Sequence, residues 1–238
     1  MKSKITVFLV LISFWACNQH VDNKNDTHSH DDGSHSHAEN KALPEGQVDI
    51  LGKTVIEATS VSPEYIQLAT NVEIIPNIND AAATTGVLTH EGIFGPLLFA
   101  EDIRAFYIEL KPGMFLSEHP HPTESIVYTV SGKWVICSEG KRQVMEPGSL
   151  FHFGSNMPTG WEAPFAEGAF LLVVKSKEEG EAFKPYMEGL QEMKIKLDEE
   201  RAKGNAFYYN ELEPDHAAIK FARSVNPDFD RVLENSKY

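Results

Sequence analysis

Short runs in which apolar and polar residues alternate fill the middle of the chain. Residues 103–110 are rich in β-branched and aromatic side chains, and a Lys-Pro-Gly turn follows them. Residues 124–131 alternate between two faces. Further strand-like runs follow at 133–137, 141–145, 149–153 and 168–175, separated by turns that contain glycine. Many short strands at roughly ten-residue spacing predict an all-β barrel or sandwich.

The segments on either side of these runs follow other patterns. Residues 46–82 contain short apolar clusters, which predict short strands or turns packed on the outside of a core. Residues 176–238 switch to helical spacing, with a capping-box pattern at Ser176 and Glu179 and with Pro185 suited to the first turn of a second helix. We expect these C-terminal helices either to clamp onto the barrel or to form a homodimer contact.

The first residues have the features of an export signal. Lys2 and Lys4 precede an apolar run at 5–16, which is too short to cross a bilayer. The run ends at Ala16-Cys17, which resembles a bacterial lipoprotein signal. The resemblance implies a signal peptide at 1–17, a lipid on Cys17 and a membrane-anchored protein on the periplasmic or cell-surface side. The alternative is ordinary cleavage nearby and a free secreted protein.

Residues 18–45 are polar and contain almost no apolar side chains. They bury too little surface to offset the entropy of folding, so we expect a disordered tether. The tether is rich in aspartate, and it has histidines at positions 28, 30, 35 and 37. Such a tract either binds Zn, Cu or Ni loosely, as a supply for a site downstream, or is simply solvated.

The net charge limits which molecules the protein can bind, and the cysteine count bears on disulfide formation. The 238 residues include 21 basic and 35 acidic side chains, for a net charge of −14. This charge repels nucleic acid and anionic membranes, so we exclude nucleic-acid binding and expect membrane contact only through the lipid anchor. With Cys17 lipidated, the second cysteine, Cys137, is expected to be a lone buried thiol.

The most specific chemical pattern is a pair of histidines, His119 and His121, each followed by proline. Proline biases the preceding residue toward extended backbone, and alternate residues of an extended chain share a face. The two imidazoles can therefore converge on one metal ion. Glu124 adds a carboxylate three residues later. The other interpretation is a proline-rich turn with two solvated histidines.

The middle of the chain resembles the cupin family. Gly113, His119, His121 and Gly132 fall at positions of the family's first motif, and the stretch 146–161 resembles the second. A hairpin of suitable length separates the two. Several dispersed matches in the right order are more specific than one His-x-His pair.

This resemblance implies both a fold and a kind of site. The fold is a single cupin-type double-stranded β-helix, or jelly-roll barrel, at 83–175, with a helical extension at 176–238. The family's third metal ligand is expected where Ser125 stands, and its fourth where Thr159 stands. The usual set of four ligands is therefore incomplete in this chain.

Three interpretations of the site follow. In the first, His119, His121 and Glu124 hold Fe, Mn or Zn, because two histidines and one carboxylate with open positions suit such metals. In the second, His152 replaces the missing histidine from a neighbouring strand. In the third, no metal is held tightly, and the barrel binds a ligand through hydrogen bonds and aromatic side chains. Tyr107, Tyr128 and Trp134 are expected to line the cavity, and Thr159 is expected to hydrogen-bond a substrate near the metal.

Two classes of function remain open. With a metal, the protein is a metal-dependent enzyme of the dioxygenase, isomerase or lyase class that acts on a small polar organic molecule. Without one, it is a non-catalytic module that binds a small ligand or a carbohydrate. The fold does not decide between these classes, because barrels of this kind carry many functions.

Overall fold

The computed structural model describes residues 64–177 and 179–236. The expected signal peptide, the lipidation site Cys17, the histidine-rich tether and the start of the 46–82 segment lie outside these described residues. Across the described ranges, no helix combines the length and the apolar composition that crossing a bilayer requires.

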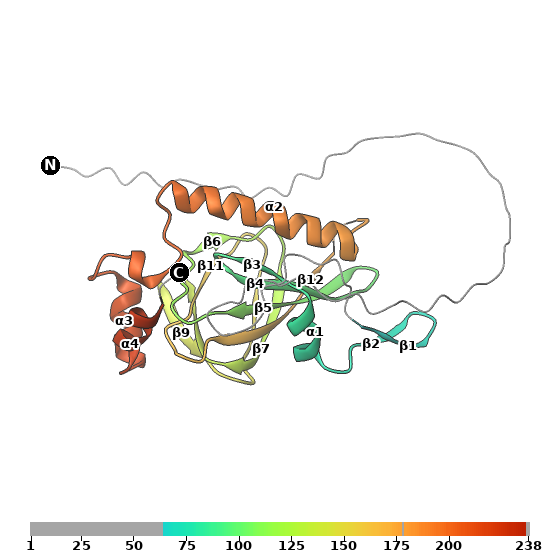
Figure 1. Ribbon diagram of the computed structural model, residues 1–238, viewed down its shortest axis with the longest axis horizontal. Coiled ribbons are helices and arrows are strands. Elements are labelled where there is room, and N and C mark those ends of the chain that lie inside the picture. The colour runs from blue at the N-terminus through green and yellow to red at the C-terminus, as the bar shows by residue number, and fades with distance from the viewer. Residues whose placement is uncertain (1–63, 178, 237–238) are drawn as a thin grey trace, which may run out of the picture.

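Two antiparallel sheets face each other around the main core (Figure 1). The six-stranded sheet has the order β10-β7-β12-β5-β4-β3, and the four-stranded sheet has the order β6-β11-β8-β9. In that order, the strands of the larger sheet are Leu150–Phe153, Ser125–Gly132, Ala169–Ser176, Ile103–Leu110, Gly92–Phe99 and Val87–Thr89. Those of the smaller sheet are His119–Pro120, Pro158–Glu162, Trp134–Ser138 and Lys141–Met145. The all-β prediction is therefore confirmed.

Strand β7 shows which face of the larger sheet points into the barrel. Ser125, Val127 and Thr129 are buried, whereas Ile126 and Tyr128 on the opposite face are 48% and 40% exposed. Successive side chains of a strand point to opposite faces, so the buried set defines the interior. The neighbouring strands β10 and β12 pair with β7, with one register shift between Phe170 and Leu171 of β12, and extend this inward face.

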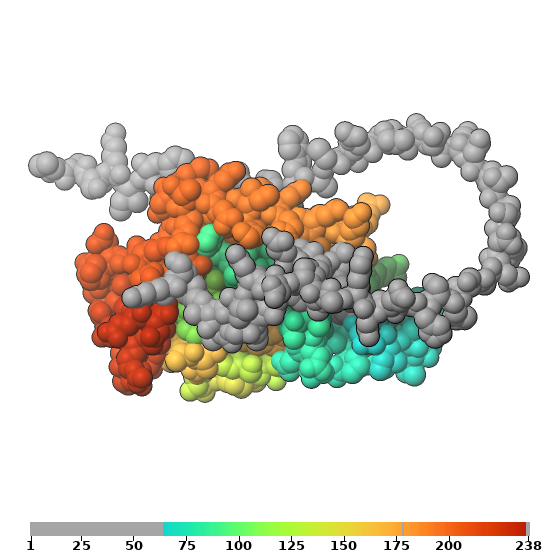
Figure 2. Space-filling model, viewed as in Figure 1, coloured from blue at the N-terminus to red at the C-terminus, as the bar shows by residue number. Residues whose placement is uncertain are grey.

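Helices cover the outside of the barrel. They are α1 (Ile78–Thr84), α2 (Phe183–Ala202), α3 (Ala217–Val225) and α4 (Phe229–Asn235), with a 3-10 turn, η1, at Tyr209–Glu211. Figure 1 shows α2 running along one side of the barrel, where it contacts β3 and β4, with α3 and α4 at one end. In the space-filling view of Figure 2, α2 forms a ridge along the edge of the molecule. The predicted helical extension is confirmed.

The predicted helix start at Ser176 is wrong. Ser176 is the last residue of β12 and pairs with Ile103 of β5, and α2 begins only at Phe183. Pairing along an eight-residue strand outweighs a local capping pattern, because the ladder satisfies the backbone groups that a helix would otherwise use. Pro185 does lie in the first turn of α2, as predicted.

The N-terminal part of the described chain contains a hairpin and an unexpected helix. Strands β1 (Ile66–Ala69) and β2 (Val72–Ile74) pair with each other, in agreement with the predicted short strands. Helix α1 was not predicted, because its apolar stripe is only one turn long. Asn77 caps it by accepting a hydrogen bond from the backbone N–H of Asn79.

A buried ion pair within the smaller sheet is hydrogen-bonded to the C-terminal extension. Glu162 on β11 is 1% exposed, and its Oε1 accepts a hydrogen bond from Arg142 Nε at 2.9 Å. Its Oε2 accepts a hydrogen bond from the Tyr209 hydroxyl at 3.1 Å. The Tyr209 ring packs against Phe115 and, on α4, Phe229. Glu162 is therefore the polar centre of the contact between barrel and extension.

Candidate functional site

His119 and His121 lie side by side at the edge of the smaller sheet. His119 is in β6, where it pairs with Thr159 of β11 in an antiparallel register. The two imidazole ring centroids are 4.5 Å apart. Each histidine precedes a proline, which favours the extended backbone that places alternate side chains on one face. The two rings are therefore neighbours on one edge of the sheet.

Backbone carbonyls orient both rings. His119 Nδ1 lies 3.0 Å from the carbonyl oxygen of Ser117, to which it donates. The backbone of Thr159 accepts a hydrogen bond from the His121 ring. His121 Nε2 is buried and has no hydrogen-bond partner among the described residues, so Nδ1 makes this bond. Each ring thus keeps Nε2 as its lone-pair nitrogen, the arrangement that metal-ligating histidines adopt.

His121 is held in its neutral form. The pKa of His121 is lowered to about 3, chiefly by burial and also by the positive charges of Lys175 and of His119 when it is protonated. A neutral imidazole can offer its Nε2 lone pair to a metal ion or to a hydrogen-bond donor.

Further buried polar atoms near the two rings are unpaired. Thr123 Oγ1, Thr159 Oγ1 and Trp161 Nε1 each lack a hydrogen-bond partner within the described part of the chain. The Trp161 ring centroid lies 6.0 Å from that of His121, and the Phe153 ring centroid lies at 4.8 Å. Native proteins pair nearly all buried polar groups, so such a cluster indicates a place where something else binds.

Glu124 does not join the two histidines. Its side chain is 67% exposed, and its Oε2 lies 3.4 Å from Nε2 of His152, which is 59% exposed. Glu124 directly precedes the inward-facing Ser125, so the alternation of side chains turns it outward. His152 faces outward as the partner of Ile126. The predicted set of His119, His121 and Glu124 is therefore not assembled, and the substitution of a ligand by His152 is wrong.

Most of the aromatic side chains predicted to contact a ligand lie away from the two histidines or are already hydrogen-bonded. Tyr128 lies on the exposed face of β7. Tyr107 is fully buried on the outer face of β5, where its hydroxyl donates to the carbonyl of Thr85 and its ring stacks on Phe170. Trp134 is inside the barrel, but its Nε1 donates to Thr129 Oγ1 at 2.9 Å. Trp134 is thus a core residue with its polar atom already paired.

Two charged residues near the histidines were not found from the sequence. Glu91 is buried in the turn between β3 and β4; burial raises the pKa of its carboxyl, and the charge of His119 acts in the opposite direction. Lys175 on β12 is close enough to His121 for its charge to lower the pKa of that ring. Nothing local in the sequence marks either residue, because only the packing of distant strands brings them to the histidines.

The middle of this barrel matches a known family. Residues 106–175 match the family model described as Cupin domain. This chain carries a cupin domain. The match confirms the resemblance that His119, His121 and the glycines of the first motif indicate, and it fits the barrel described above. A comparison with curated proteins finds no match.

Several solved structures are similar to part of the chain. An RmlC-like cupin from Shewanella frigidimarina is 20% identical, covers 40% of this chain and 84% of its own, and gives a TM-score of 0.36. The polyketide cyclase RemF from Streptomyces resistomycificus is 19% identical, with coverage of 38% and 68% and a TM-score of 0.35. The DMSP lyase DddQ from Ruegeria pomeroyi is 20% identical, with coverage of 35% and 42% and a TM-score of 0.31. Similarity at this level transfers no ligand or reaction to this chain.

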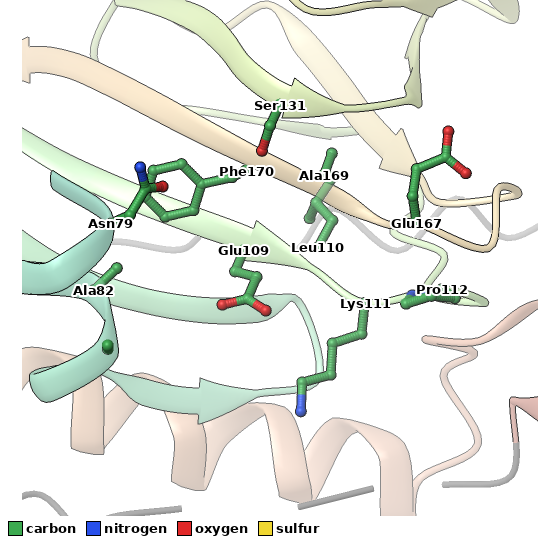
Figure 3. Close-up of a pocket in the computed structure, with 11 residues that line it drawn as sticks. Asn79, Ala82, Glu109, Leu110, Lys111, Pro112, Ser131, Glu167, Ala169 and Phe170 are labelled. Atoms are coloured by element: carbon green, nitrogen blue, oxygen red, sulfur yellow. The ribbon is translucent and has the colours of Figure 1, made fainter. Parts of the chain in front are cut away.

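A separate hollow of about 220 Å³ lies on the outer surface of the cupin barrel. Figure 3 shows Asn79 and Ala82 of α1 on one side of it and Glu167 on the other, with Glu109 and Lys111 between them. Neither His119 nor His121 lines this hollow. The site at His119 and His121 is therefore distinct from this hollow.

Cys137 is a free, buried thiol, as expected. Its Sγ donates to Glu118 Oε1 at 2.8 Å, and the Gly140 backbone N–H donates to the same oxygen. Burial, reinforced by Glu118, raises the pKa of Cys137 to about 12. The thiol therefore stays protonated at neutral pH and is a poor nucleophile and metal ligand.

Proposed function

We propose that this protein binds a small polar organic molecule where His119 and His121 meet, together with a divalent metal ion that these two imidazoles hold. The observation that carries the proposal is the pair of rings 4.5 Å apart, each with Nδ1 bonded to the backbone and Nε2 left for another partner. Unpaired Thr159 and Trp161 atoms beside them supply hydrogen bonds for the organic molecule.

The donor set fits a metal ion with two protein ligands. Neutral imidazole nitrogens suit Fe, Mn and Zn. Among the described residues, no group of three or more His, Cys, Asp and Glu side chains is placed to hold one ion, so His119 and His121 supply the protein's share. When bound, the metal supplies a Lewis acid that polarises the ligand or lowers the pKa of bound water.

The protein's own groups have separate parts in this proposal. The Ser117 and Thr159 carbonyls fix the ring orientations of His119 and His121. Burial around His121 excludes water and keeps that imidazole neutral. The carboxyl of Glu91 has its pKa raised by burial and interacts with the charge of a protonated His119, so this proposal assigns it the role of proton acceptor.

The site is compatible with two classes of function. A metal-dependent enzyme of the dioxygenase, isomerase or lyase class is favoured by the oriented Nε2 atoms. A non-catalytic module that binds a small ligand or a carbohydrate is favoured by Glu124, which is turned away from the histidines, and by Ser125 and Thr159 at expected ligand positions. Turnover of small organic substrates, including oxygen consumption, separates the two.

Metal content tests the proposal. The full chain and its His121→Ala variant are loaded separately with Zn, Mn and Fe(II), dialysed and measured by elemental analysis. We expect the wild type to retain about one metal ion per chain more than the variant, because two imidazoles act together on one ion. The histidine-rich tether is present in both proteins, so its contribution cancels.

His152→Ala is the matched control, because His152 is an exposed histidine on the outer face of the same barrel. Its metal content is expected to equal that of the wild type. Equal metal content in His121→Ala and the wild type, with the variant shown to be folded by circular dichroism, would overturn the metal site.

We also propose that the mature chain is anchored to a membrane by a lipid on Cys17, on the periplasmic or cell-surface side. The support is the lipoprotein-like signal at the N-terminus, with Cys17 after its apolar run. Cys17→Ala is expected to move the protein from the membrane fraction to the soluble fraction in cell fractionation, because lipidation needs the thiol. Membrane association that persists in Cys17→Ala would refute the lipid anchor, and Cys137→Ala is the control that keeps it.

A further inference from the structure

One inward-facing row crosses three neighbouring strands beside the histidines. Phe153 of β10 pairs with Ser125 of β7, and Ser125 pairs with Lys175 of β12. Directly paired residues of an antiparallel sheet point to the same face. Since Ser125 and Phe153 are buried inside the barrel, the Lys175 side chain starts from the same inner face. The Phe153 ring lies against His121, so the row ends at the proposed site.

Lys175 brings positive charge to this part of the interior. It lies in the same paired row as Ser125 and Phe153, two strands away from the Phe153 ring that contacts His121. The next residue in the row, Arg104 of β5, forms an ion pair with Glu181 and lies over the ring of Tyr186. The guanidinium of Arg104 is thus directed toward α2, whereas Lys175 starts from the inner face on which the Phe153 ring lies against His121.

The unpaired atoms beside His121 define the hydrogen bonds that a ligand must make. Trp161 Nε1–H can only donate, and it is buried without a partner in the described chain. The hydroxyls of Thr123 and Thr159 are also buried and unpaired there, and each can donate. The indole therefore requires an acceptor on the ligand, and an acceptor oxygen can also take a hydrogen bond from either hydroxyl. An ammonium group forms its strongest hydrogen bonds with negatively charged acceptors.

We propose that the organic molecule bound at this site carries a carboxylate, held by the ammonium of Lys175 and by the donors of Trp161 and Thr159. This inference rests on the proposed function and names its ligand class. A carboxylate is preferred to a phosphate because the proposal places one lysine at the site, whereas phosphate groups are usually bound by arginine forks or by several backbone N–H groups. The two oxygens of a carboxylate are enough to accept hydrogen bonds from Lys175, Trp161 and Thr159.

The indole resonances of tryptophan provide a direct test. The chain has three tryptophans, and Trp15 lies in the leader, outside the described residues. Trp134 is bonded to Thr129, whereas Trp161 is unpaired. The full chain is labelled with isotope-enriched tryptophan, and the Trp161 indole N–H is assigned with Trp161→Phe. Acetate and succinate are titrated against their uncharged amides, acetamide and succinamide, and against inorganic phosphate.

We expect the two acids to move the Trp161 resonance at lower concentrations than their amides or phosphate do. The Trp134 resonance is expected to stay in place. Lys175→Gln should weaken acid binding about tenfold, the usual effect of losing one charged hydrogen-bond partner. Lys175→Arg keeps the charge and should retain the preference for acids. Lys184→Gln, at a side chain that is 84% exposed on α2, makes the same change of net charge and should have no effect.

The outcomes separate this inference from the proposed function. If amides bind as well as acids, or if Lys175→Gln binds acids unchanged, the carboxylate proposal fails while ligand binding at the barrel stands. Tighter binding of phosphate than of either acid also overturns it. If no probe moves the Trp161 resonance, the carboxylate proposal fails, and the metal measurements on His121→Ala decide independently whether the two-histidine site is real.

Discussion

Replacing Trp134 with alanine is expected to lower the free energy of unfolding by about 3–5 kcal/mol, the range observed when a large aromatic side chain is removed from a packed core. Trp134 is 0% exposed, lies inside the barrel and packs against Phe151 at 5.6 Å between ring centroids. Small domains are stable by only about 5–15 kcal/mol, so the variant should unfold at much lower urea concentrations. Equilibrium unfolding in urea, followed by circular dichroism, measures the difference.

A double-mutant cycle separates the packing of Trp134 from its hydrogen bond. Thr129→Val removes the acceptor and leaves the indole N–H buried and unpaired, which costs about 1–3 kcal/mol. Trp134→Phe keeps most of the ring volume, and combining it with Thr129→Val removes both polar partners. We expect the double variant to be more stable than the sum of the two single effects implies. A loss below about 1 kcal/mol in Trp134→Ala would contradict the buried position of Trp134.

The strand pattern was predictable because each strand is short and bounded by a local turn signal. The predicted run 103–110 is β5, and 141–145 is β9, with the same limits. Strand β11 (Pro158–Glu162) was not predicted as a strand, although its residues carry the second cupin motif. It contains a proline and a glycine and lacks an alternating pattern, so only its pairing with β6 and β8 makes it a strand.

Which face of β7 points inward could not be predicted from that strand alone. Both faces contain apolar residues, and the face with Ile126 and Tyr128 is at least as apolar as the one with Val127. The choice is made by the neighbours: Val173 of β12 pairs with Val127, and both are buried in the core. Tyr128 was therefore assigned to the wrong face. A shift of one residue in register turns every inward-facing side chain of a strand outward.

Only the part of the site formed by residues close together in the sequence could be predicted. His119 and His121 are two residues apart, and their prolines bias the backbone, so their convergence could be read from the sequence. Glu91 and Lys175 lie 28 and 54 residues from His119 and His121 in the chain, and their proximity depends on sheet topology. Trp161 is part of the recognised motif region, but that its indole N–H is buried and unpaired could be learned only from the packed structure.

Replacing Arg142 with methionine is expected to lower the free energy of unfolding at about pH 8 by about 3–5 kcal/mol, because it leaves the carboxylate of Glu162 buried without its cation. The two side chains are 12% and 1% exposed, so solvent cannot take over the role of the guanidinium. The Tyr209 hydroxyl remains as a hydrogen-bond donor to Glu162, but it carries no charge. Lys141→Met, at an exposed neighbouring position on β9, is the matched control and should cost much less.

The pH dependence of this loss identifies Glu162 as its cause. Burial raises the pKa of Glu162 above the ordinary value of 4.5, and Arg142 opposes that rise, so its removal raises the pKa further. The native state then binds a proton more tightly than the unfolded state does, and stability falls as pH rises from 4.5 through the folded-state pKa. The difference between Arg142→Met and the wild type should therefore be smaller at about pH 5 than at about pH 8. Adding Glu162→Gln removes the titrating carboxyl and should abolish this pH dependence in urea unfolding. A loss that is the same at both pH values would show that the lost packing around Arg142, and not the charge on Glu162, causes the loss of stability.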